Sequence, residues 1–136
     1  MKTTKQTFGV IIATRNIFNY KLAVEARKKV LEKLDKMGFG YVILPGSETP
    51  TGNIEGYDDA VKCAAYFKKH SDEIEGIVVV LPNFGDELGV VNSIKLSGLK
   101  VPVLVQACDD DNDKVDVKSR RDAFCGKLSV CNNLCQ

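Results

Sequence analysis

The chain has 136 residues, of which 44% are apolar and 27% are charged, a composition typical of one ordinary globular domain. Its 19 basic and 18 acidic side chains leave a net charge of +1, which excludes a global attraction to nucleic acid or to an anionic membrane. The first apolar run, of about six residues, is too short for a signal peptide or for a membrane span of roughly 20 residues. We therefore expect a cytoplasmic protein with no nucleic-acid partner and no membrane partner.

Continuous apolar runs and helical repeats alternate along the first half of the chain. The branched run at residues 8–13 predicts a strand that is covered on both faces. A helix is expected after it, with Asn19 as its cap and Gly38 as its stop. A second strand is predicted at 41–44, followed by a loop rich in proline and glycine. The next predicted helix spans 57–70, with acidic residues in its first turn and basic residues in its last, as the helix dipole favours.

The second half repeats this alternation twice. A third strand is predicted at 76–81, and Asp86 and Glu87 open a helix that ends at Gly98. A fourth strand is predicted at 101–105, and an acidic loop separates it from a last helix. The side chains expected to face inward from these two helices are Leu88, Val91 and Ile94, and then Phe124, Leu128, Cys131 and Leu134.

Strand and helix alternate four times, which implies parallel strands joined by right-handed crossovers. We therefore predict an α/β fold, a three-layer doubly wound parallel sheet of the Rossmann or flavodoxin-like type with strand order 2-1-3-4. A fifth strand usually closes such a sheet, and the last helix reaches Gln136 without a stop signal. We expect residues 1–136 to be a single N-terminal Rossmann-like domain that lacks its last strand and is a truncated part of a longer multidomain chain.

Polar and aromatic residues follow three of the predicted strands, at positions 14–16, 82–87 and 106–109. The carboxyl ends of parallel strands share one rim of the sheet, and open α/β sheets bind ligands at that rim where the strand order reverses. In the order 2-1-3-4 this reversal lies between the first and third strands. The first two segments therefore form the predicted pocket.

Each of these residues has a functional and a structural interpretation. The planar fork of Arg15 suits a carboxylate, a phosphate or paired sugar hydroxyls, or else it pairs with Asp86 or a helix carboxylate. Asn83 can donate and accept hydrogen bonds, and Phe84 can stack on the apolar face of a sugar ring. Asp86 and Glu87 contact a ligand or are plain charges at a helix N-terminus.

Several familiar sites are excluded by the residues present. The first strand-to-helix turn, residues 13–19, contains no glycine, so it holds neither a dinucleotide fingerprint nor a P-loop. The acidic run at 109–113 has calcium-loop spacing, but Lys114 stands where that loop needs glycine and Arg120 where it needs glutamate. We expect a solvated loop there.

Cysteine and histidine usage points away from metal and nucleophilic chemistry. The five cysteines show no CxxC spacing, and His70 is the single histidine, so neither a zinc site nor a Cys-His or Ser-His arrangement is indicated. The thiols are interpreted as buried or semi-buried and free, with a metal or redox role as the alternative, and His70 is interpreted as a cation at a helix C-terminus. We predict no catalytic residue and no metal ligand within this chain.

Three segments carry a resemblance to a known family. These are Thr14-Arg15-Asn16, the run Val79 to Glu87 with its Pro-Asn-Phe-Gly-Asp-Glu ending, and the run Arg120 to Leu134. Together they resemble the N-terminal domain of the L-fucose isomerase and L-arabinose isomerase-like proteins, over nearly the whole chain.

The resemblance implies a role in a larger enzyme. Members of this family are metal-dependent ketol isomerases, typically with manganese, in which the cation polarises oxygens while carboxylates move a proton through an enediol. Their metal ligands belong to later domains, and the N-terminal domain contributes sugar contacts to a neighbouring subunit. By position Arg15 matches the family's substrate-contacting arginine, and Asn83 or Phe84 stands where fucose isomerases place an aromatic residue. The chain has no tryptophan, so the family's Trp is absent here.

The resulting hypothesis is the substrate-recognition domain of a sugar isomerase that is inactive by itself. Its expected partners are a monosaccharide, its own C-terminal domains and the neighbouring subunits of a homo-oligomer. Manganese or another divalent cation is expected in the full-length parent and none in this part. The alternative is a free-standing sugar-binding or regulatory module. The expected substrate-binding residues are Arg15, Asn16, Asn83, Phe84 and Asp86. The apolar side of the last helix, with Cys131, Leu134 and Cys135, is expected to drive association.

Overall fold

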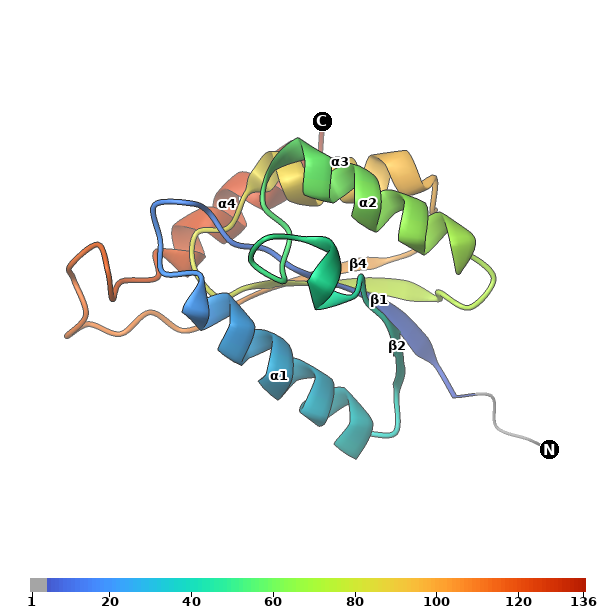
Figure 1. The fold of residues 1–136 in the computed structure, drawn as a ribbon, viewed down its shortest axis with the longest axis horizontal. Helices are drawn as coiled ribbons and strands as arrows, with labels where there is room; N and C mark the ends of the chain where they lie inside the picture. The colour runs from blue at the N-terminus through green and yellow to red at the C-terminus, as the bar shows by residue number, and fades with distance from the viewer. Residues whose placement is uncertain (1–4) are drawn as a thin grey trace.

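Strands and helices alternate from one end of the domain to the other (Figure 1). The computed structural model describes residues 5–136. The elements are β1 (Thr7–Ile12), α1 (Lys21–Lys36), β2 (Gly40–Val42), a 3-10 turn (Gly46–Glu48), α2 (Gly56–Lys69), β3 (Gly76–Leu81), α3 (Glu87–Ser97), β4 (Val103–Ala107) and α4 (Ala123–Leu134). Every predicted strand and helix is present, which confirms the α/β class.

The four strands form one parallel sheet in the order β2-β1-β3-β4. Val10 of β1 is opposite Val78 of β3, and Val79 of β3 is opposite Val105 of β4. This is the predicted doubly wound order 2-1-3-4. The carboxyl ends of β1 and β3 are therefore neighbours. The strand order reverses between them, because β2 is added on one side of β1 and β3 on the other.

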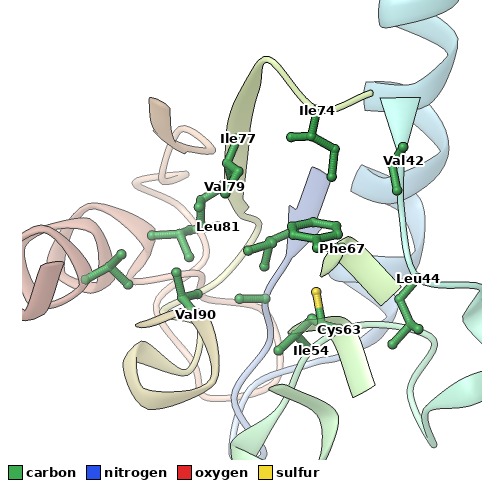
Figure 2. Close-up of a cluster of buried hydrophobic side chains, with 13 residues drawn as sticks. Val42, Leu44, Ile54, Cys63, Phe67, Ile74, Ile77, Val79, Leu81 and Val90 are labelled. Atoms are coloured by element: carbon green, nitrogen blue, oxygen red, sulfur yellow. The ribbon is translucent and has the colours of Figure 1, made fainter. Parts of the chain in front are cut away.

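Helices cover the two faces of the sheet unequally. Helices α2, α3 and α4 lie together on one face, and α1 lies alone on the other (Figure 1). The larger core cluster fills the face under α2, α3 and α4, and Phe67 lies in the middle of it (Figure 2). The smaller cluster, under α1, consists of Val10, Ile12, Ala23 and Val80. Most of the buried apolar surface, which is the main stabilising contribution, is thus on the three-helix face.

The inward faces of α3 and α4 differ from those expected. Leu88 is 59% exposed, and on α4 Phe124 is 61% and Leu128 59% exposed. Glycine residues explain why both helices turn different faces inward from those predicted. At Gly89 an added Cβ would lie 3.2 Å from Ile54, and at Gly126 it would overlap the carbonyl group of Phe84. The helices approach their neighbours closely on these glycine sides, and the large side chains next to them turn outward.

The other inward positions on these helices are confirmed. Val91 is buried, Ile94 and Leu134 pack against the larger core cluster, and Cys131 is half-buried. The three residues expected to form one apolar side of the last helix are therefore divided, because Leu134 faces the core while Cys135 is exposed. The exposed apolar residues of α4 are instead Phe124 and Leu128.

Element boundaries also differ from the prediction at β2, β4 and α1. β2 ends at Val42, two residues before the predicted end. β4 begins at Val103 and continues to Ala107, so Gln106 lies within the strand and not in the loop after it. Tyr20 is the cap residue of α1 and makes no side-chain cap bond. Asn19 still acts locally, because its side-chain oxygen accepts a hydrogen bond of 3.0 Å from the Lys21 N–H.

Candidate functional site

The candidate site begins where β1 leaves the sheet. The Ala13 N–H donates to the Val80 carbonyl at 3.1 Å, and the Thr14 N–H donates to the Ile54 carbonyl at 3.0 Å. Backbone pairing thus continues past the end of the strand, and Thr14 is completely buried. Arg15 is the first residue to emerge at the rim, with Asn16 exposed beside it.

Asn83 joins this turn to the loop after β3. Its Nδ2 donates to Thr14 Oγ1 at 2.9 Å, and its Oδ1 accepts from the Gly85 N–H at 3.0 Å. Asn83 is fully buried, so both ends of its amide are used inside the domain. Gly85 has φ +74°, a left-handed conformation that favours glycine. Asn83 therefore positions the two rim loops from inside the domain. It does not face solvent itself.

Arg15 and Phe84 form the centre of the site. The guanidinium carbon of Arg15 lies 4.9 Å from the centre of the Phe84 ring, within the range of a cation–π contact. Arg15 Nη1 also lies 3.3 Å from Glu87 Oε2, at side-chain exposures of 39% and 21%. This contact lacks hydrogen-bond geometry, so it is a single charge pair and not a bidentate clamp. Of the two structural pairings open to Arg15, the one with the helix carboxylate Glu87 is formed.

Two further residues extend this contact into a stack. The rings of Phe84 and Phe18 are 6.2 Å apart with an interplanar angle of 20°, and the guanidinium of Arg120 lies 5.8 Å from the Phe18 ring. The side chains stack in the order Arg15, Phe84, Phe18 and Arg120. They connect three loops that are distant in the sequence. Neither Phe18 nor Arg120 was among the predicted site residues. The only local signal was the position of Phe18 in the first rim loop.

Asp86 caps α3. Its Oδ1 accepts from the Gly89 N–H at 2.6 Å, the usual bond of a cap residue to the third residue of the helix. This supports the structural interpretation of Asp86. Its charge also contributes to a group of three carboxylates at the starts of α2 and α3, with Glu55 and Asp59.

Burial changes the acidity of that group. Burial raises the pKa of Glu55 above its usual range, and the nearby Asp59 and Asp86 carboxylates raise it further. Burial also raises the pKa of Asp59, which is 6% exposed, although its Oδ2 accepts a hydrogen bond from the Glu55 N–H at 3.0 Å. The charged forms of both acids are therefore disfavoured in the folded domain.

Helix α4 supports the loop that carries Phe84. Arg121 Nη1 donates to the Pro82 carbonyl at 2.7 Å. Gly126 lies directly against the Phe84 backbone, with no space for a Cβ. The amino end of α4 is itself held by Asp110, whose Oδ1 accepts from the Ala123 N–H at 3.1 Å. The last helix therefore fixes the height of the Phe84 loop above the sheet.

The candidate metal ligands and the thiols are dispersed over the described structure. Within residues 5–136 no three His, Cys, Asp or Glu side chains are grouped to hold a metal ion. In the acidic loop Asp111 pairs with Lys114 at 3.3 Å. The single histidine, His70, pairs with Glu73 at 2.8 Å. The five cysteines are free, but Cys125 and Cys135 are exposed, so the expectation of buried or semi-buried thiols is wrong for these two. Burial raises the pKa of the Cys63 thiol to about 12, which disfavours its reactive thiolate form.

A parallel sheet in the order 2-1-3-4, with a charged and aromatic rim between β1 and β3, defines a Rossmann-type α/β domain. The fucose/sulfoquinovose isomerase N-terminal domain family matches residues 9–136. The chain belongs to this family. Comparisons with individual characterised proteins and with solved structures found no match. In the part of the chain that the structure describes, no helix combines the length and the apolar character needed to cross a bilayer.

The contact of Gly126 with Phe84 predicts a specific cost of substitution. Gly126→Ala adds a methyl group where there is no space, so we expect the free energy of unfolding to fall by about 1–3 kcal/mol despite the better helix propensity of alanine. Chemical denaturation measures this change. Cys125→Ala, at the exposed neighbouring position, is the matched control. A Gly126→Ala variant as stable as the parent would show that α4 is not held against the Phe84 loop.

The raised pKa of Glu55 predicts a pH dependence of stability. A carboxyl whose pKa is raised by folding stabilises the fold below its ordinary pKa of about 4.3, and this contribution is lost as the pH rises through the raised value. Glu55→Gln should therefore be more stable than the unmodified chain at pH 7, by less than about 1 kcal/mol for this partly exposed group. The difference should shrink toward pH 4.

Denaturant titrations at several pH values test this expectation. Asp72→Asn, which changes an exposed carboxyl outside the carboxylate group, serves as the control. A Glu55→Gln variant that is less stable than the unmodified chain at pH 7 would contradict the expected sign and would indicate that the fold uses the Glu55 charge.

Proposed function

We propose that this chain is the substrate-recognition domain of a metal-dependent aldose–ketose isomerase. The family match supports an isomerase N-terminal domain, and the Arg15–Phe84 pair at the reversal of the strand order supports a role in binding sugar. The observation that carries the proposal is the contact between the half-exposed Arg15 guanidinium and the Phe84 ring. Both residues lie on rim loops that the buried Asn83 holds together.

Each rim residue has a distinct task in this proposal. Phe84 offers the sugar an apolar contact through the part of its ring that Arg15 and Phe18 leave exposed, and Arg15 offers several N–H donors to the hydroxyl oxygens. Asn16 is exposed beside Arg15 and adds an amide donor and acceptor. Asp86 can accept with the oxygen not used in capping α3. Asn83 contributes from beneath, by holding the two loops at a constant separation.

The chemical step is assigned to other parts of the enzyme. In this proposal manganese or another divalent cation would supply polarisation of the sugar oxygens. The described residues do not fit such a cation, since no three of their potential ligands lie close enough together to share one ion. The cation site is therefore placed in the C-terminal domains, and the domain described here completes the pocket, in a neighbouring subunit of a homo-oligomer. This domain binds and orients the monosaccharide and takes no part in proton transfer.

Because the chemical step is assigned to other domains, we predict that the 136-residue chain alone is inactive. We expect no ketose from L-fucose, L-arabinose or sulfoquinovose when manganese is added to the pure chain, and turnover of at least one of them by the full-length parent. A colorimetric ketose assay measures both. Turnover by the 136-residue chain would refute the placement of the chemistry in other domains. Sugar binding by this chain, together with a reading frame that ends at Gln136, would instead favour a free-standing sugar-binding or regulatory module.

Arg15 provides the sharpest test of substrate recognition. A hydrogen bond from a charged group is worth about 1.5–3 kcal/mol, so Arg15→Ala in the full-length parent should lower kcat/KM by about tenfold or more. The melting temperature should barely change, because a half-exposed ion pair with Glu87 contributes at most about 1 kcal/mol.

Two variants control this measurement. Arg15→Lys keeps the charge but loses the planar fork, and Lys28→Ala removes an exposed cation from the outer side of α1. We expect a partial loss of kcat/KM in the first and no loss in the second. Unchanged kinetics with a clear drop in melting temperature for Arg15→Ala would assign Arg15 to folding.

A further inference from the structure

The sheet face under α1 is only half covered. Helix α1 packs over β1 and β2, where Val10 and Ile12 are buried against Ala23. The same face continues onto β3 and β4 without a second helix (Figure 1). At its end Leu104 of β4 is 63% exposed. Parallel sheets are normally covered by helices on both faces, so half of this face lacks the usual cover.

A groove of about 510 Å³ occupies this half of the face. Its floor is formed by Val78, Val80 and Leu104, and one wall by the side of α1 that carries Val30 and Leu34. None of the rim residues around Arg15 and Phe84 lines it. The groove is therefore an apolar surface separate from the candidate sugar site.

The charges around the groove are predominantly basic. Lys29 and Lys33 project from α1 beside it, and Arg121 lies at the end near the rim of the sheet. Glu25 is the only carboxylate in the lining, and its pair with Lys29 leaves Lys33 and Arg121 as the excess positive charge. An occupant that lies against α1 should therefore carry acidic side chains along that edge.

A second copy of the chain is a poor candidate to cover this groove. Mutual covering of two grooves would place each α1 between two sheets, but the outer side of α1 carries exposed charges such as Lys28, Glu32 and Asp35. These charges would lose their hydration without gaining partners, which strongly disfavours such a dimer. Insertion of the exposed Phe124 and Leu128 of another copy would be a head-to-tail contact, which builds a ring or a filament and not a two-fold dimer.

The topology indicates how the parent polypeptide reaches the groove. Among the described strands β4 pairs only with β3, which leaves its outer edge available for another parallel strand. A strand added there after α4 extends the sheet, and a helix that then returns on the face of α1 lies over β3 and β4. Two helices side by side on a sheet are about 8–10 Å apart, so one helix beside α1 fills the groove.

We propose that this groove is occupied by one amphipathic α-helix from the parent polypeptide beyond Gln136, with its apolar side on Val78, Val80 and Leu104 and acidic residues facing Lys29 and Lys33. This inference rests on the proposed function, in which the domain is part of a longer isomerase. The groove is then an internal contact of the enzyme and not a ligand site.

Thiol labelling at the floor of the groove tests the proposal. Leu104→Cys is made with Cys108, Cys125, Cys131 and Cys135 replaced by serine, and the buried Cys63 stays unreactive. The rate of modification by a maleimide is measured in the 136-residue chain and in the full-length parent. We expect the cysteine at 104 to react at least tenfold more slowly in the parent. The control is Val24→Cys on the outer side of α1, where Val24 is 47% exposed, and its rate should be similar in both proteins.

A charge-reversal pair tests the acidic edge independently. In the parent, Lys29→Glu with Lys33→Glu should lower the melting temperature more than Lys28→Glu with Lys36→Glu, a pair of exposed positions outside the groove. In the 136-residue chain the two pairs should differ only by the loss of the surface Lys29–Glu25 ion pair, which is a small effect. Equal effects of the two pairs in the parent would overturn the assignment of an acidic helix.

The outcomes separate this proposal from the proposed function. Equal labelling of Leu104→Cys in both proteins, with isomerase turnover by the parent, overturns the groove assignment and leaves the enzyme assignment intact. Protection at position 104 in a parent that isomerises no sugar supports the groove assignment and overturns the enzyme assignment. A reading frame that supplies no helix beyond Gln136 overturns the groove assignment directly.

Discussion

A buried amide holds together the two loops on which the candidate site depends. Asn83 donates to Thr14 and accepts from Gly85, at the point where the parallel pairing of β1 and β3 ends. An unmade hydrogen bond at such a buried group costs about 1–3 kcal/mol, so separation of the two loops is opposed from inside the domain. The position of Arg15 over Phe84 follows from this link. The rim is therefore ordered by the interior and remains accessible at its surface.

The charges at the rim are partly satisfied and partly available. Asp86 uses one oxygen to cap α3, and Arg15 shares its guanidinium between Glu87 and the Phe84 ring. Because the ion pair of Arg15 is single and half-exposed, a ligand can engage its remaining donors without breaking a buried hydrogen bond. This combination gives an ordered site at a low cost of rearrangement.

The two faces of the sheet have different roles. On the three-helix face, Gly89 and Gly126 allow α3 and α4 to approach their neighbours closely, which closes the larger core and supports the Phe84 loop. On the α1 face, Val80 is buried while Leu104 is exposed, so the cover stops halfway. Stability and site geometry therefore come from one face, and the other retains a partly uncovered apolar surface.

The sequence by itself determined the order of elements, the parallel sheet and the two rim segments that hold Arg15 and Phe84. These features follow from hydrophobic periodicity and from the shared edge of parallel strands, which are local or topological properties. The tertiary structure decided which sides of α3 and α4 are buried, because helix rotation depends on how closely Gly89 and Gly126 let the neighbours approach. It also decided the interior place of Asn83 and the stack of Phe18 with Arg120, since contacts between residues distant in the chain leave no local pattern.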